Sequence, residues 1–143
     1  MAKPEPHLLD PARYPVRCEI EPRFGDLDTN LHINNVALAG ILEEARVRFH
    51  RSVGLPMGRE GISQMVASFS IEYLGQSHYP EPLEIHVAAI DIGRTSQTLG
   101  QLVIQNGQHV AFARVVLVNV RDNRPAEHSQ AFREAVRPWM LKR

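Results

Sequence analysis

The sequence has little of several features that would place a protein in a specialised class. It carries one cysteine, Cys18, which excludes an internal disulfide and a cysteine-based metal cluster. Lysine plus arginine count 16 and aspartate plus glutamate count 16, so the formal charge is zero with neutral histidines. Nucleic-acid-binding proteins usually show a basic excess or stripe. We therefore expect a reducing compartment and no nucleic-acid partner.

Long apolar runs are also missing. No stretch approaches the ~18 consecutive apolar residues of a membrane span. The opening MAKPEP lacks the apolar segment of a signal peptide. We therefore expect a cytoplasmic protein without a membrane partner. Apart from His32 the histidines are scattered singly, with no metal-binding spacing such as His-Glu-x-x-His, so we predict no metal site.

The first part of the chain is rich in proline. Prolines at positions 4, 6, 11 and 15 block helices and strand ladders, which predicts an extended N-terminal arm over residues 1–15. Residues 16–143 are enough for one domain of ordinary size. Apolar and polar residues alternate from Val16 to Pro22 and predict a strand, in which Cys18 is a small core residue.

A change of hydrophobic period follows. Residues 23–33 read as a loop, and the proline-free stretch from Asn35 to Val53 predicts one long helix, buried in its first half and ended by glycines and Pro56. Alternation then predicts four strands, at about residues 64–73, 83–89, 98–105 and 109–120. A last helix is expected after Ser129.

The arrangement of these elements predicts an α+β fold. Asn106-Gly107 between the last two strands is a strong hairpin signal, and short links between consecutive strands indicate an antiparallel sheet. Residues 110–118 are apolar on both faces apart from Arg114, so this strand should be central. One long helix must bury its apolar face, and the sheet is its only large partner. We expect a curved antiparallel sheet wrapped around one central helix.

The candidate site is the loop before the long helix. Asp28, Asn30, His32, Asn34 and Asn35 fall within eight residues, and Asp26 lies just upstream. A carboxylate can act as a general base on water or as a nucleophile. Backbone N–H groups at a helix start can stabilise a developing oxyanion. The segment therefore holds the components needed to hydrolyse an acyl thioester.

The motif resembles a known family. GDLDTNLHINN at 25–35, with LEEAR at 42–46, resembles the hotdog-fold thioesterases of the 4-hydroxybenzoyl-CoA thioesterase superfamily. It also looks like the Asp-x-Asn-x-His-x-Asn-Asn segment of plant acyl-ACP thioesterases. The resemblance extends over roughly residues 16–121, and GRTS at 93–96 is a weaker part of it. It implies a hotdog fold with the active site at a dimer interface.

The resemblance also implies roles for individual residues. The family's catalytic aspartate falls on Asp28, and the assisting asparagine and histidine fall on Asn30 and His32. The family's helix glutamate falls on Glu44, which we expect to contact the substrate together with Asn35, Arg94 and Ser96. Two departures stand out. The first branch often has Pro-Ala-Gly where this chain has Thr-Asn-Leu at 29–31, and Leu38 replaces an aromatic residue common in the early helix.

Each of these residues also has an ordinary structural explanation. Asp28 and His32 could hold the loop, and Asp26 is more simply a turn or strand-end hydrogen-bond acceptor. Asn34 and Asn35 could form the turn and the helix cap. Glu43 and Glu44 could form surface ion pairs with Arg46 and Arg48. Arg94 and Ser96 could be solvated residues that do not bind a CoA phosphate.

Three functions remain open at this point. The first is hydrolysis of acyl-CoA or acyl-ACP, with coenzyme A as part of the substrate and no separate cofactor. The second is an enoyl-CoA hydratase-like lyase, whose usual Asp-x-Asn-Pro-x-His arrangement has one more residue between aspartate and histidine than Asp28 and His32. The third is a module that binds acyl-CoA without turnover.

The last two strands carry few charges to protect an exposed edge, so we expect a homodimer with a continuous sheet, or a tetramer of two such dimers.

Overall fold

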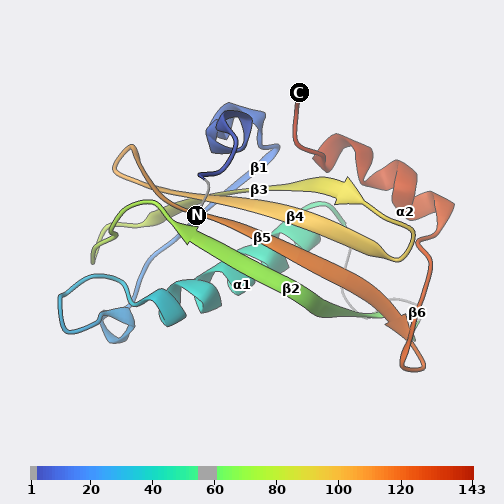
Figure 1. The fold of residues 1–143 in the computed structure, drawn as a ribbon, viewed down its shortest axis with the longest axis horizontal. Helices are drawn as coiled ribbons and strands as arrows, with labels where there is room; N and C mark the ends of the chain where they lie inside the picture. The colour runs from blue at the N-terminus through green and yellow to red at the C-terminus, as the bar shows by residue number, and fades with distance from the viewer. Residues whose placement is uncertain (1–2, 55–60) are drawn as a thin grey trace.

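A computed structural model describes residues 3–54 and 61–143 of the chain. The main helix is α1 (Asn35–Ser52), and a shorter helix α2 (Gln130–Ala135) lies near the C-terminus. The strands are β1 (Val16–Ile20), β2 (Ser63–Tyr73), β3 (Leu83–Ile92), β4 (Ser96–Gln105), β5 (Gln108–Arg121) and the two-residue β6 (Arg124–Pro125). Figure 1 shows α1 running across one face of the sheet, which is the predicted α+β architecture. Among the described residues, no helix is both long and apolar enough to span a membrane.

The sheet is antiparallel with the order β1-β3-β4-β5-β2, and β6 pairs with β5. The last long strand, β5, is central as predicted. The expectation that the last two strands form the open edge was wrong, because β1 and β2 occupy the two edges. The first two strands, β1 and β2, are consecutive in the sequence but lie at opposite edges of the sheet, which the alternation within single strands does not reveal.

Two features confirm the local turn signals. Asn106 and Gly107 have φ of 52° and 76°, the left-handed pair typical of a two-residue hairpin, and Gln105 pairs with Gln108 across it. Gly54, with φ of 72°, follows the end of α1, as expected for a glycine that ends a helix. Pro56, which was expected to help end this helix, lies outside the described residues.

The N-terminal segment is not an extended arm. Pro6–Leu9 and Pro11–Arg13 form two single-turn 3-10 helices, because proline φ suits the first position of such a turn. Leu8 and Tyr14 are buried, and the Tyr14 hydroxyl donates to the Leu8 carbonyl at 2.6 Å. The segment covers part of the sheet face opposite α1, where Tyr14 packs with Leu102.

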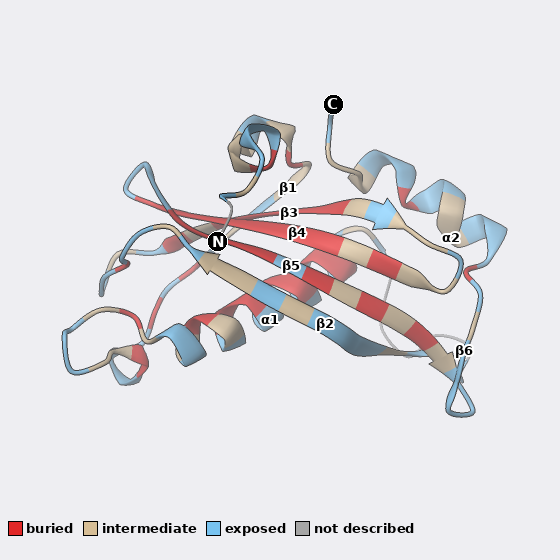
Figure 2. Ribbon diagram, viewed as in Figure 1, coloured by how far each residue is buried: buried red, intermediate tan, exposed pale blue. Residues whose placement is uncertain are grey.

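The main core lies between α1 and the other face of the sheet. Its largest fully buried members include Leu42 and Phe49 from α1 and Leu99 and Val115 from β4 and β5. Cys18 packs against this core, as predicted for a small core residue. Figure 2 shows that buried residues concentrate in β3, β4 and β5, whereas β2 is mostly exposed or half-buried. The edge formed by β2 is therefore the least protected part of the sheet.

Candidate active site

The loop that carries Asp28 closes on itself. The Asp28 N–H donates to the His32 carbonyl at 2.8 Å, and the Leu31 N–H donates to the Asp28 carbonyl at 3.1 Å. Asp28 Oδ1 accepts from the N–H groups of Asn30 at 2.8 Å and His32 at 3.1 Å. Among the described residues Oδ2 makes no hydrogen bond. The carboxylate thus holds the loop with one oxygen and keeps the other available.

Leu31 occupies the strained position of this loop. Its φ is 63°, in the left-handed region that favours glycine, and its side chain is 67% exposed. Glycine is often found at this position in the thioesterases that the motif resembles, so this chain has a different residue there but keeps a conformation typical of glycine. A leucine in this conformation costs about 1–2 kcal/mol. The tight Asp28–His32 turn is therefore retained in spite of that cost.

Asp26 connects the loop to the residues before it and to the helix start. It is buried, and its carboxylate accepts from the Arg23 N–H at 2.8 Å and from Arg23 Nη2 at 3.2 Å. Its carbonyl accepts from the Asn34 N–H at 2.7 Å. Burial alone would raise the pKa of Asp26, but the hydrogen bonds and charge of Arg23 outweigh it and lower this pKa. Asp26 is thus an ionised structural acceptor.

The start of α1 is capped by Asn34. Its Oδ1 accepts from the N–H groups of Val36 at 2.7 Å and Ala37 at 3.3 Å, which are two of the free donors of the first turn. These two amides are therefore occupied and not directed at a substrate oxygen. Asn35 is exposed, and its carbonyl accepts from the Tyr73 hydroxyl of β2 at 3.0 Å.

A second histidine, His78, lies beside His32, and the sequence analysis did not assign it to the site. The rings of His32 and His78 are 5.2 Å apart between centroids, because the Ile33 N–H donates to the Ser77 carbonyl at 3.0 Å. The His78 N–H in turn donates to the side chain of Gln105 at 2.8 Å. His78 belongs to the linker before β3, and only the folded chain shows that it reaches the loop.

The structure does not bring two of the predicted substrate contacts, Arg94 and Ser96, to this loop. Gln105 ends β4 near the loop, whereas Ser96 begins the same ten-residue strand, about 30 Å away along it. Arg94 pairs with Glu127 at 2.8 Å, and both side chains are exposed. Within one protomer, Arg94 and Ser96 therefore lie at the far end of the sheet from Asp28.

Glu44 lines a groove of about 610 Å³ beside the loop. The groove runs between the segment around Arg23 and the first half of α1, and its lining includes Asp26 and Gly40 but not Asp28. Glu44 forms an ion pair with Arg48, one helical turn later. Among residues 3–54 and 61–143, no group of three or more histidine, cysteine, aspartate or glutamate side chains is placed to hold a metal ion.

Comparisons with known proteins identify the family of the chain. A family model described as the thioesterase-like superfamily matches residues 22–137. The chain is similar to a thioesterase of Thermus thermophilus solved with coenzyme A and Zn, at 30% identity, 87% coverage of this chain, 94% of that chain and a TM-score of 0.78. No match was found among curated proteins.

Two further solved structures share the fold. The PA5185 protein of Pseudomonas aeruginosa PAO1 is 24% identical, with 91% of this chain and 94% of that chain covered and a TM-score of 0.80. A DHNA-CoA thioesterase of Staphylococcus aureus is 19% identical, with coverages of 83% and 86% and a TM-score of 0.77. At these identities the similarity concerns the fold alone.

Proposed function

The chain belongs to the thioesterase-like superfamily and has the hotdog fold, and from this premise we propose that it hydrolyses acyl-CoA thioesters with Asp28 as general base or nucleophile. The observation that carries the proposal is the geometry of the Asp28 carboxylate. Its Oδ1 is fixed by the amides of Asn30 and His32, and its Oδ2 accepts no hydrogen bond from residues 3–54 and 61–143. A carboxylate held in this way is oriented without losing its capacity to accept a proton.

The reaction would proceed in a few balanced steps. Asp28 Oδ2 takes a proton from water as the water oxygen bonds to the thioester carbonyl carbon, or attacks that carbon directly to give an anhydride that water then opens. The carbon–sulfur bond breaks, and the thiolate of coenzyme A leaves and is protonated. The products are a free acid and a thiol.

The developing charge on the carbonyl oxygen needs hydrogen-bond donors. Val36 and Ala37 at the helix start are occupied by the Asn34 cap, so we assign this work to the side chains of Asn30 and His32. Asn30 is exposed and His32 is half-buried beside His78. Both side chains are in the loop that Asp28 organises.

Coenzyme A as the carrier is supported by the Thermus thermophilus relative, which was solved with coenzyme A. The proposed contacts Asn35, Glu44, Arg94 and Ser96 surround the substrate only if a second copy contributes. Pairing of β2 with the same strand of a partner is antiparallel about a twofold axis. It places the far end of one sheet beside the Asp28 loop of the other, so we propose a homodimer with a continuous sheet, or a tetramer of two dimers.

The test is a panel of acyl-CoA and acyl-ACP substrates of different chain length, with release of the free thiol measured by steady-state kinetics. Turnover of at least one substrate that is strongly reduced in Asp28→Asn supports the proposal. Binding without turnover would favour the module that only holds acyl-CoA. Hydration of an enoyl-CoA would favour the lyase.

A further inference from the structure

A group of polar side chains is buried between the second half of α1 and β4. Arg46, His50, Gln97 and Gln101 are only 8%, 2%, 1% and 0% exposed. Arg46 Nη1 donates to Gln101 Oε1 at 3.3 Å, and Gln101 Nε2 donates to the Leu42 carbonyl at 2.9 Å. Both ring nitrogens of His50 and both amide atoms of Gln97 lack a hydrogen bond of good geometry among the described residues, although the Gln97 side chain lies close enough to raise the pKa of His50. We refer to these four residues as the polar cluster.

The polar cluster is unusual because buried polar groups are normally satisfied. Four buried atoms without a well-formed hydrogen bond, on two neighbouring side chains, leave hydrogen-bonding capacity for a further group. Arg46 adds a charge to this environment, and the ion pairs of the described residues do not include it. Burial lowers the pKa of Arg46 and the charge of Glu43 only partly opposes this, so a closer anionic partner would be favoured there.

The polar cluster lies next to the strand that forms the open edge of the sheet. The Arg46 guanidinium lies 5.2 Å from the centre of the Phe69 ring, and Phe69 belongs to the edge strand β2. Val66, on the same strand and the same face, pairs with Leu117 and is 50% exposed. The face of β2 that looks toward α1 is therefore only partly covered.

The proposed dimer would bring this end of the sheet toward the catalytic loop of the other copy. The C-terminal end of β2 adjoins the loop region, since the Tyr73 hydroxyl donates to the Asn35 carbonyl. Antiparallel pairing about a twofold axis sets that end beside the N-terminal half of the partner's strand. Val66 and Phe69 lie on this strand, so the polar cluster would be within reach of an acyl chain that starts at Asp28.

We propose that Arg46, with the polar cluster around it, binds a carboxylate at the far end of the acyl group, so that dicarboxylic acyl-CoA thioesters are the preferred substrates. The inference rests on the proposed thioesterase function. A guanidinium offers several N–H donors in a planar fork that matches a carboxylate. Gln97 and His50 offer further hydrogen bonds. Burial lowers the pKa of His50, and although the interaction with Gln97 opposes this shift, the pKa stays below its ordinary value, which favours a neutral ring with one donor and one acceptor.

The experiment compares CoA thioesters of equal chain length with and without a terminal carboxylate, over a series of lengths. For the wild type we expect kcat/KM to favour the carboxylate form by roughly 10- to 100-fold at the best length, the range for a charge-assisted hydrogen bond. Arg46→Met should reduce this ratio to near one or below. Arg46→Lys keeps the charge and loses the fork, so it should give an intermediate ratio.

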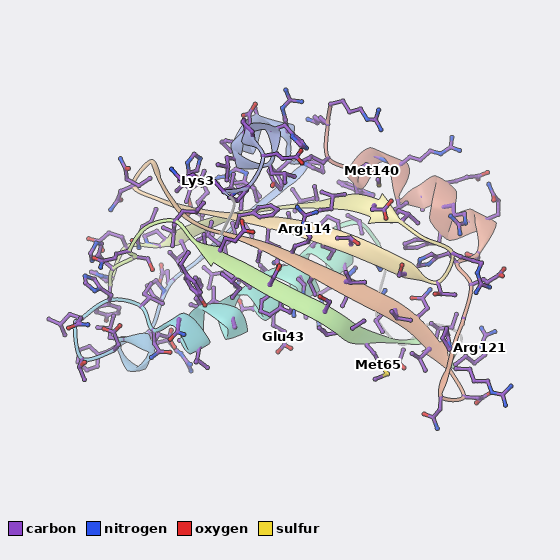
Figure 3. The ribbon with its side chains drawn as sticks, in the orientation of Figure 1. Lys3, Glu43, Met65, Arg114, Arg121 and Met140 are labelled. Atoms are coloured by element: carbon purple, nitrogen blue, oxygen red, sulfur yellow. The ribbon has the colours of Figure 1, made fainter. Side chains whose placement is uncertain are left out.

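Arg114→Met is the matched control. Arg114 also lies over an aromatic ring, 5.6 Å from the centre of Phe112, but it projects from the sheet face opposite α1. Figure 3 shows Arg114 over the sheet, far from the border where Glu43 and Met65 project. This variant should keep the wild-type ratio. Melting curves of all variants show whether each one folds.

The outcomes separate this inference from the proposed function. If thioesters are hydrolysed but the wild type shows no preference for the carboxylate form at any length, or Arg46→Met keeps the preference, then the polar cluster holds buried water only and the inference is wrong. If no thioester is hydrolysed, the proposed function fails. Thermal shifts then decide, because free dicarboxylic acids should stabilise the wild type more than monocarboxylic acids do, and Arg46→Met should remove the difference.

Discussion

Asp28→Asn separates the chemical role of Asp28 from its role in holding the loop. The asparagine amide oxygen can still accept from the N–H groups of Asn30 and His32, which lie 2.8 Å and 3.1 Å from Oδ1. Only the negative charge is lost. Each hydrogen bond then weakens from a charge-assisted to a neutral one, which removes about 1 kcal/mol per bond and at most about 2 kcal/mol in total. The melting temperature should fall by no more than about 4–8 °C.

The effect on turnover should be much larger. Loss of a general base costs ~10²–10⁴-fold in rate, which corresponds to about 3–5 kcal/mol of transition-state energy. We expect this loss in kcat, with a small change in KM, when thiol release from one good acyl-CoA substrate is followed. Circular dichroism should confirm a native fold. A folded Asp28→Asn with nearly full turnover would refute the assignment of Asp28 as base or nucleophile.

Asp26→Asn is the matched control for this experiment. Its carboxylate is buried and receives the backbone and side-chain donors of Arg23 at 2.8 Å and 3.2 Å. It lies two residues from Asp28 in the same segment, so the two variants change the same chemical group in neighbouring positions. We expect Asp26→Asn to lower the melting temperature more than Asp28→Asn and to lower kcat far less. The reverse ranking in kcat would show that the two carboxylates have been assigned the wrong roles.

Three further predictions follow from the same structure. His32→Ala should reduce kcat by ~10²–10³-fold, the cost of one oxyanion donor, and a loss equal to that of Asp28→Asn would contradict the division of roles. Val66→Lys places a charge on the open edge strand and should shift light scattering toward the monomer with a parallel loss of activity, whereas an active monomer would contradict the shared site. The pKa of His50 is lowered by burial, so the unfolded chain binds a proton that the folded chain does not, and stability should fall as pH drops below about 6.5 by up to about 1.4 kcal/mol per pH unit. Urea unfolding of His50→Gln should show a smaller fall, and an unchanged slope would exclude His50 as its source.

Local features of the fold could be predicted because they depend on short stretches of sequence. The proline-free segment predicted α1, which ends at Ser52, one residue before the predicted end. Asn106-Gly107 predicted the hairpin with its left-handed pair. The N-terminal prolines were misinterpreted because a fixed φ near −65° suits both an extended chain and the first position of a 3-10 turn. Burial of Leu8 and Tyr14 selects the turn.

Features that depend on distant contacts could not be predicted. The order of the strands depends on the pairing of β1 with β3 and of β2 with β5, and alternation within one strand says nothing about its neighbours. Gln101 and Gln105 are buried in β4 because their amides bond to the carbonyls of Leu42, His78 and Glu81. Those partners are 24 to 59 residues away in the sequence. Both glutamines look like ordinary polar residues of an exposed face until the chain is folded.

The candidate site likewise combines features that the sequence predicted with features that depend on distant contacts. The motif placed Asp28, Asn30 and His32 in one loop, and the structure shows how the carboxylate closes that loop. The motif could not show that β4 separates Arg94 and Ser96 from this loop by about 30 Å. If those residues contact the substrate, they must come from a second copy. A twofold pairing at the open edge of β2 would bring them there with a continuous sheet, so the same unpaired strand would account for both the expected dimer and the completion of the site.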